Sequence, residues 1–241
     1  MSTRISLPLL GGLLVTGRLV ASEPVIPDVA MPPLPVRAGT VEAFVPAGWA
    51  IESRLDGAVD TDALPDVVLL LRDRDPTNIV RNDGLGVDTL DTNPRLLAVL
   101  AAEAGGGYRR LALSDQVVRR NTRPEWSDPL EEGGLALERR VLSVTTGFFS
   151  SAGSWSMGHT THRFRWQDGC MRLIGYDDSS LQRNTGETTD VSVNLLTRRT
   201  TRTVGSIEHD RAATTRGVLE RRAPICLEDA ADGRFEDLPD T

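Results

Sequence analysis

Three arginines and a tyrosine lie on the two strands of a predicted β-hairpin, where they could bind an anion. The dipeptide Asp168-Gly169 suits a two-residue turn with positive φ at both positions. The register that follows sets Arg165 opposite Arg172, with Arg163 and Tyr176 on the same outward face. Like charges directly opposite each other are destabilising, so an acidic side chain or an anionic ligand should lie over them. We favour an intramolecular acid and keep a ligand as the alternative.

The same register predicts which hairpin residues face the core. It pairs Arg163 with Ile174, and it points four apolar side chains inward, namely Phe164, Trp166, Met171 and Leu173. Trp155 lies in a short Gly-Ser-Trp-Ser stretch and is predicted to anchor either the core or an interface. The candidate ligand-binding residues are therefore Arg163, Arg165, Arg172, Tyr176 and Trp155.

Closely spaced carboxylates between residues 55 and 66 could bind a hard cation. Asp60, Asp62 and Asp66 precede the apolar run 67–71, and carboxylate oxygens are the ligands that Ca²⁺ prefers. The segment resembles the calcium loop of integrin-type FG-GAP and VCBS repeats, which implies a calcium site. Ala58 stands where that family has a leading acid, so we expect an affinity no tighter than millimolar. The alternative is an acidic turn retained for its shape.

The chain from about residue 44 to residue 210 also resembles a group of exported bacterial proteins of unknown function. The resemblance rests on Trp49, the loop and strand at 60–71, the Gly-Gly-Gly-Tyr stretch at 105–108, the Gly-Ser-Trp-Ser stretch at 153–156 and the hairpin at 164–176. It implies a β-rich exported domain. It supplies no catalytic residue. We expect no cofactor other than weakly bound calcium at the aspartate loop.

Serine and histidine residues lie close together between positions 154 and 162. Ser154 and Ser156 precede His159 and His162, so a hydrolase built on such a Ser/His site is the alternative function. The stretch lacks the Gly-x-Ser-x-Gly strand-to-helix turn of a nucleophile elbow. The His159-x-x-His162 spacing puts the two imidazoles on opposite faces of a strand, which disfavours zinc. We therefore favour a protein that is not an enzyme.

The chain has two cysteines, Cys170 and Cys226. An even number of cysteines in an exported chain favours a disulfide, which would attach the C-terminal region to the hairpin. Two separate thiols are the alternative.

The N-terminal region has the order of a secretory signal. Arg4 is followed by the apolar run 5–15 and by small residues near Ala21, so residues 1–21 are predicted to be a signal peptide. A run of this length is shorter than the about 20 residues that span a bilayer, so we expect no integral membrane segment in the mature chain. Residues 22–40 contain five prolines and are predicted to be a mobile linker. The expected location is periplasmic or secreted.

Short runs of alternating or continuous apolar residues predict a mainly β fold for residues 41–210. We expect an antiparallel, hairpin-rich sandwich or an open barrel-like sheet, with little helix outside the signal segment and the tail. Residues 95–104 could form either a helix or a strand, and the glycines at 105–107 favour a strand that returns as a hairpin. Other strands are expected at 41–45, 49–54, 67–71, 135–138, 141–149, 160–167, 170–176, 187–195 and 200–204. Residues 211–241 should be a polar, acidic tail with one short helix at 218–222.

The net charge of the chain argues against nucleic acid as a partner. The chain carries a formal charge of −7 and its 27 basic residues are all arginine, so the basic surface of a nucleic-acid-binding protein is not expected. The leading functional prediction is a non-enzymatic exported β-domain that binds a protein partner or an envelope component.

Overall fold

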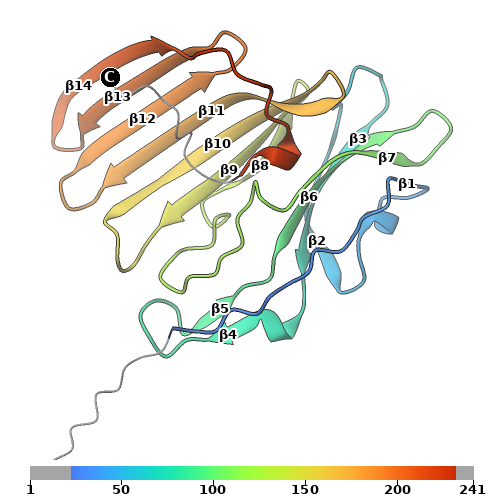
Figure 1. Ribbon diagram of the computed structural model, residues 1–241, viewed down its shortest axis with the longest axis horizontal. Coiled ribbons are helices and arrows are strands. Elements are labelled where there is room, and N and C mark those ends of the chain that lie inside the picture. Colours follow the sequence, from blue (N-terminus) through green and yellow to red (C-terminus); the bar gives the residue numbers. More distant parts are fainter. Residues whose placement is uncertain (1–22, 232–241) are drawn as a thin grey trace, which may run out of the picture.

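Two antiparallel β-sheets make up most of the described protein. The computed structural model describes residues 23–231. One sheet has five strands in the order β1-β7-β6-β3-β2, and the other has seven in the order β14-β13-β12-β11-β10-β9-β8 (Figure 1). The predicted fold class, mainly β with antiparallel sheets, is therefore confirmed. The predicted signal peptide at 1–21 lies outside the described residues.

The five-stranded sheet comprises β1 (Arg37–Ala38), β2 (Trp49–Gly57), β3 (Asp66–Asp73), β6 (Arg95–Ala102) and β7 (Tyr108–Ser114). The seven-stranded sheet comprises β8 (Gly134–Glu138), β9 (Val141–Phe149), β10 (Ser156–Gln167), β11 (Cys170–Gln182), β12 (Glu187–Asn194), β13 (Arg199–Ser206) and β14 (His209–Val218). A small pair, β4 (Ile79–Arg81) and β5 (Thr89–Asp91), lies in the loop after β3, and three 3-10 turns are described, namely η1 (Glu42–Phe44), η2 (Pro76–Asn78) and η3 (Leu227–Asp229).

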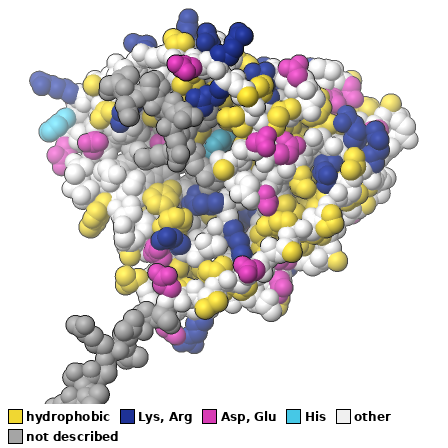
Figure 2. Space-filling model, viewed as in Figure 1, with side chains coloured by type: hydrophobic (Ala, Val, Ile, Leu, Met, Phe, Trp, Pro, Cys, Tyr) yellow, Lys and Arg dark blue, Asp and Glu magenta, His cyan; other side chains and the backbone are white. Residues whose placement is uncertain are grey.

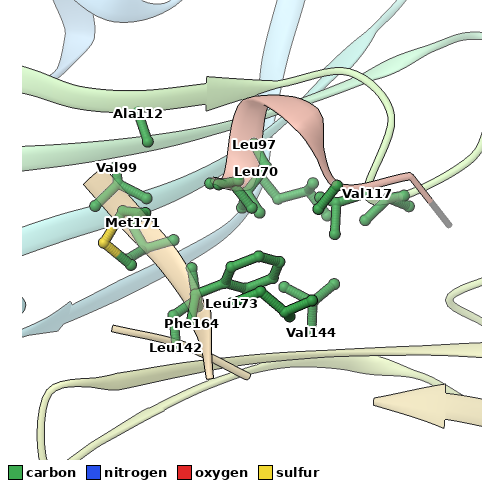
Figure 3. Packing of buried hydrophobic residues seen from close by; sticks show 14 of the residues in the cluster. Leu70, Leu97, Val99, Ala112, Val117, Leu142, Val144, Phe164, Met171 and Leu173 are labelled. Atoms are coloured by element: carbon green, nitrogen blue, oxygen red, sulfur yellow. The ribbon is translucent and has the colours of Figure 1, made fainter. Parts of the chain in front are cut away.

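The central strands β3 and β6 are apolar on both faces because both faces are covered. One face packs against the seven-stranded sheet, where Leu70 and Leu97 meet Leu142, Val144 and Phe164 (Figure 3). The opposite face is covered by a second cluster built on Leu69, Leu71, Leu96, Leu100 and Phe44. The strand expected at residues 95–104 is thus confirmed as β6, since a continuous apolar run suits a strand that is buried on both sides.

The N-terminal segment covers the outer face of the five-stranded sheet, which corrects the expectation of a mobile linker at residues 22–40. Leu34 is buried in the second cluster, and β1 pairs with β7. Arg110 fixes this segment by donating its Nη1 proton to the carbonyl oxygen of Leu34 at 2.6 Å. Prolines favour an extended chain, and an extended chain with apolar residues between its prolines can lie along a sheet.

The β10–β11 hairpin follows the predicted register for four residue pairs and then departs from it. Asp168 and Gly169 have φ angles of 54° and 79°, as the predicted turn requires. Arg165 lies opposite Arg172, but Arg163 lies opposite Gly175 because Ile174 forms a β-bulge. One extra residue reverses the alternation of side chains beyond it, so every later residue of β11 changes face.

Other local expectations also required correction. Residues 42–44 form the 3-10 turn η1 rather than a strand. The start of the predicted tail is strand β14, and residues 219–222 are not helical. Within residues 23–231, no helix combines the length and the apolar character needed to cross a membrane.

The disulfide between Cys170 and Cys226 is present, so the pairing predicted from the cysteine count is confirmed. It attaches the chain beyond β14 to the first residue of β11. This chain continues into η3, whose Leu227 is fully buried in the core between the two sheets.

Candidate functional site

An exposed group of two aromatic rings and one arginine lies at the end of the seven-stranded sheet where β9 meets β10. We call Phe149, Trp155 and Arg183 the aromatic ridge. Trp155 is 61% exposed and Phe149 is 36% exposed, although both are large apolar side chains. The guanidinium carbon of Arg183 lies 4.5 Å from the Phe149 ring centroid and 5.6 Å from that of Trp155. These distances are within the range of cation–π contacts.

Backbone carbonyls hold the arginine of the ridge in place. The Nη2 group of Arg183 donates to the carbonyl oxygens of Ser150 and Ser154, the second at 2.9 Å. Its Nε donates to the carbonyl oxygen of Trp155 at 3.3 Å, and its backbone N–H donates to the same oxygen at 2.9 Å. The loop that carries Trp155 is therefore attached to the end of β11 by these hydrogen bonds.

A groove of about 430 Å³ adjoins the ridge on the inner face of β9, β10 and β11. Its lining includes Ser156 and Gln182, the immediate chain neighbours of Trp155 and Arg183. Trp126 and Phe148 form an aromatic wall, with ring centroids 5.5 Å apart in an edge-to-face arrangement. Arg119 lies 5.8 Å from the Trp126 centroid and donates to the carbonyl oxygen of Gly147 at 2.9 Å.

The floor of the groove is polar and tightly packed. The hydroxyls of Thr146 and Thr160 are 3.0 Å apart, and Asp178 lies opposite Thr160 on β11. Gly158 is required here because a Cβ atom at this position would lie 2.1 Å from the carbonyl oxygen of Ser179. The groove thus offers hydroxyl, carboxylate and amide groups beside an aromatic wall, a combination that suits polar organic ligands and peptides.

The predicted arginine face is only partly assembled as the sequence suggested. Arg163 forms an ion pair with Asp177, an intramolecular acid of the kind that the sequence favoured. Arg172 has Asp168 as its nearest acid, with 3.8 Å between nitrogen and oxygen. Tyr176 was expected on this face, and this was wrong because the bulge at Ile174 turns the ring to the inner face, where it is 1% exposed. Whether any of these residues binds a ligand stays a prediction.

The three aspartates of the predicted calcium loop do come together. One carboxylate oxygen from each of Asp60, Asp62 and Asp66 lies within 4.8 Å of the other two. Asp66 is fully buried, and its Oδ2 accepts hydrogen bonds from the backbone N–H groups of Val59 at 2.7 Å and Asp60 at 3.1 Å. Its Oδ1 accepts from the N–H of Ala102 at 3.0 Å. These contacts explain the cluster as a turn-forming device, and the weak calcium site stays a prediction.

The serine and histidine residues do not form a catalytic relay among the described residues. Ser156 lines the groove together with His159 and Asp178. However, Ser156 and His159 are three residues apart on β10 and point to opposite faces, and no hydrogen bond joins the two. The hydroxyl of Ser154 accepts from the N–H of Ser156 at 3.1 Å. His162 is buried beside Phe164 and Tyr176, with ring centroids 6.3 Å and 5.2 Å away.

A network of charges joins the five-stranded sheet to the loop that leads into the seven-stranded sheet. Glu52 accepts from Arg95 at 2.6 Å and from Arg72 at 3.1 Å, and Arg95 also donates to Asp128 at 3.0 Å. Burial raises the pKa of Glu52, but the hydrogen bonds and charges of the two arginines outweigh burial and hold its pKa below the ordinary value. Every charge has an opposite partner, so we assign this network to the stability of the fold.

The sequence pointed to Trp155 but missed the rest of the ridge. Phe149 ends a predicted strand and Arg183 lies in an unremarkable polar stretch, so neither residue carried a local signal. The two residues meet because β9 and β11 are the two neighbours of β10 and their C-terminal ends lie at the same end of the sheet. Comparison with protein-family models finds no match to this chain, and comparisons with curated proteins and with solved structures also find none.

Proposed function

We propose that this protein is a non-enzymatic exported β-domain that binds a protein partner through the aromatic ridge. The observation that carries the proposal is the exposure of Trp155 and Phe149 on either side of an arginine fixed by backbone carbonyls. Tryptophan and arginine are enriched among residues that dominate interface energies. A ridge that is ordered in advance loses little conformational entropy when it becomes buried against a partner.

The groove supports this proposal because it extends the ridge with polar recognition groups. A partner that covers Trp155 can place a side chain or loop into the space between Trp126 and the floor at Thr160. The central contact would be aromatic and dry, and the hydroxyl and carboxylate groups would form a polar surround. An envelope component is the second type of ligand that this combination fits.

Crosslinking and affinity capture from envelope extracts test the proposal. The wild-type chain and the Trp155→Ala variant are used as baits under identical conditions, and captured proteins are quantified by mass spectrometry. We expect the wild type to capture at least one protein whose captured amount falls at least tenfold with Trp155→Ala. The reason is that substitution of a hot-spot residue weakens the binding free energy by about 2 kcal/mol or more.

Val218→Ala provides the matched control. Val218 is also a large exposed apolar residue, at 64% exposure, but it ends β14 at the opposite end of the sheet. The capture profile should be unchanged by this substitution. A profile that Trp155→Ala leaves intact, or that both substitutions change equally, would contradict binding at the ridge.

A hydrolase is the second candidate function, favoured by one observation. Ser156 and Asp178 line the same groove, and His159 is also among its lining residues although it follows Ser156 by three positions on β10. A fluorophosphonate probe tests for an activated serine. Labelling that disappears in Ser156→Ala and persists in Ser154→Ala would support the hydrolase, whereas an unlabelled wild-type chain supports the binding domain.

Export is part of the proposal and rests on two features. The apolar run at residues 5–15 has signal-like order, and a disulfide joins Cys170 to Cys226, as is common outside the reducing cytoplasm. Fractionation followed by N-terminal sequencing tests it. Recovery of chain that begins near residue 22 from the periplasm or medium is expected, and an intact N-terminus in the cytoplasm would contradict export.

A further inference from the structure

A second cavity, of about 350 Å³, lies at the opposite end of the seven-stranded sheet from the aromatic ridge. It is bounded by the first residues of β11, the turn between β12 and β13, and the segment 219–225 that follows β14. Strand β10 runs between the two ends, and its 12 residues span about 40 Å. The cavity is therefore a separate feature from the ridge and its groove.

Covalent and backbone bonds hold the walls of this cavity together. The N–H of Leu173 donates to the carbonyl oxygen of Ile225 at 2.8 Å, one residue from the disulfide at Cys226. On the other side, the N–H of Leu219 donates to the carbonyl oxygen of Arg198 at 2.8 Å. The segment 219–225 is thus attached at both ends, and the cavity is a built part of the fold.

The charge of the cavity is opposite to that of the chain. Among the described residues, four arginines line it, namely Arg172, Arg198, Arg221 and Arg222, and Glu220 is the one acid in that lining. The whole chain carries a formal charge of −7. Figure 2 shows arginine side chains gathered along the upper edge of the molecule, the end at which the β12–β13 turn lies in Figure 1.

Two of these arginines have no carboxylate partner in the part of the chain that the structure describes. Among residues 23–231, no carboxylate lies within 4.0 Å of Arg198 or Arg221, whereas Arg163 and Arg95 have direct acid partners. Arg198 instead donates to the carbonyl oxygen of Leu219 at 3.5 Å. Guanidinium groups keep their charge at all physiological pH values, so a cavity lined by four of them favours an anion.

We propose that this cavity binds a phosphate group carried on a small apolar body. A phosphate dianion offers several acceptor oxygens to the forked donors of arginine, and such pairs are short and strong. The remaining lining is apolar, chiefly Leu195, Leu196 and Leu219, and it would contact the non-phosphate part of the ligand. Both a soluble phosphomonoester and the headgroup of an anionic lipid have this chemistry.

Calorimetric titration with hexyl phosphate and with inorganic phosphate tests the proposal on the full chain with its disulfide intact. We expect one site, tighter binding of hexyl phosphate than of inorganic phosphate, and affinity that falls as salt concentration rises. Arg221→Gln should weaken binding of hexyl phosphate at least tenfold. Arg221 is exposed and has no described carboxylate partner, so this substitution should leave folding unchanged.

Arg81→Gln is the matched control because it removes the same charge from an exposed side chain on β4, outside the cavity. Its affinity for hexyl phosphate should equal that of the wild type. Near-ultraviolet circular dichroism should be the same for all three proteins. Absence of binding, equal loss in both variants, or no loss in Arg221→Gln would overturn the phosphate site, and equal affinities for the two phosphates would overturn the apolar part.

Vesicles of phosphatidylcholine with and without phosphatidic acid distinguish the two sources of the phosphate group. Cosedimentation with the acidic vesicles that Arg221→Gln loses would support a lipid headgroup. Binding of hexyl phosphate without cosedimentation would support a soluble phosphomonoester. The capture experiment on Trp155 is independent of both results, so this site and the partner-binding ridge can fail separately.

Discussion

Asp66 shows how a carboxylate in a calcium-loop pattern can serve the backbone. Its position before an apolar strand fits the pattern of a calcium loop, and the structure does bring it close to Asp60 and Asp62. Yet both of its oxygens accept backbone hydrogen bonds, two from the turn at residues 59–60 and one from Ala102 at the end of β6. The carboxylate therefore closes the turn between β2 and β3 and joins it to the neighbouring strand.

Asp66→Ala should destabilise the protein by at least about 3 kcal/mol. Three N–H groups would lose their acceptor, and each buried group left without a partner costs about 1 to 3 kcal/mol. Asp62→Ala is the control, because Asp62 is exposed and, among the described residues, its carboxylate accepts one hydrogen bond, from the N–H of Leu64. The cost should therefore be below about 1 kcal/mol. Urea unfolding measures both. Equal effects, or a rise in Tm at micromolar calcium, would show that the loop is primarily a cation site.

At the scale of strands and hairpins, the sequence predicted most of the elements but not their complete register. Val141–Phe149 matches β9 end to end, and the Asp168-Gly169 turn sets the first four pairs of the β10–β11 hairpin correctly. The sequence gives no local signal for the bulge at Ile174. Leu173 and Ile174 are both apolar, so their residue types do not indicate which of them is left unpaired. That one residue moved Tyr176 from the predicted binding face to the core.

Loss of the disulfide should act mainly on the C-terminal segment. The two cysteines are 56 positions apart, and closing a loop of this length stabilises a protein by about 4 kcal/mol in the chain-entropy model. Cys226→Ser should lower the free energy of unfolding by about 2 to 4 kcal/mol. Hydrogen exchange should also quicken in residues 219–230, while β3 and β6 stay protected. Uniform quickening throughout both sheets would contradict a local role for the bridge.

At the scale of the whole molecule, the two sheets differ in how much of their surface is buried. The five-stranded sheet is buried on both faces, by the seven-stranded sheet and by the N-terminal segment. The outer strand β14 is exposed along most of its length. Sequence patterns predicted the buried strands well, whereas both candidate sites lie where distant segments meet at the sheet's ends. Such sites depend on topology, which periodicity does not encode.

The charge network around Glu52 should make the stability of the protein sensitive to acid, because it connects the five-stranded sheet to the loop that leads into the seven-stranded sheet. Its pKa lies below the ordinary value of 4.5 in the folded protein because the two arginines outweigh the effect of burial. The unfolded chain therefore binds the proton more readily, so the stabilisation is fully present above about pH 5 and is lost as pH falls through the folded-state pKa.

Glu52→Gln should lower the free energy of unfolding by about 1.5 to 3 kcal/mol at pH 7, the range for hydrogen bonds to charged groups. The wild-type and variant stabilities should converge as the pH falls from 4.5 through the lower folded-state pKa of Glu52, because below that pKa the wild-type carboxyl is protonated as well. Asp56→Asn is the control, since its pair with Arg54 is exposed and should contribute less than about 1 kcal/mol. Urea unfolding between pH 3 and pH 8 measures the curves, and a difference between wild type and Glu52→Gln that stays constant with pH would show that the lost contact is not electrostatic.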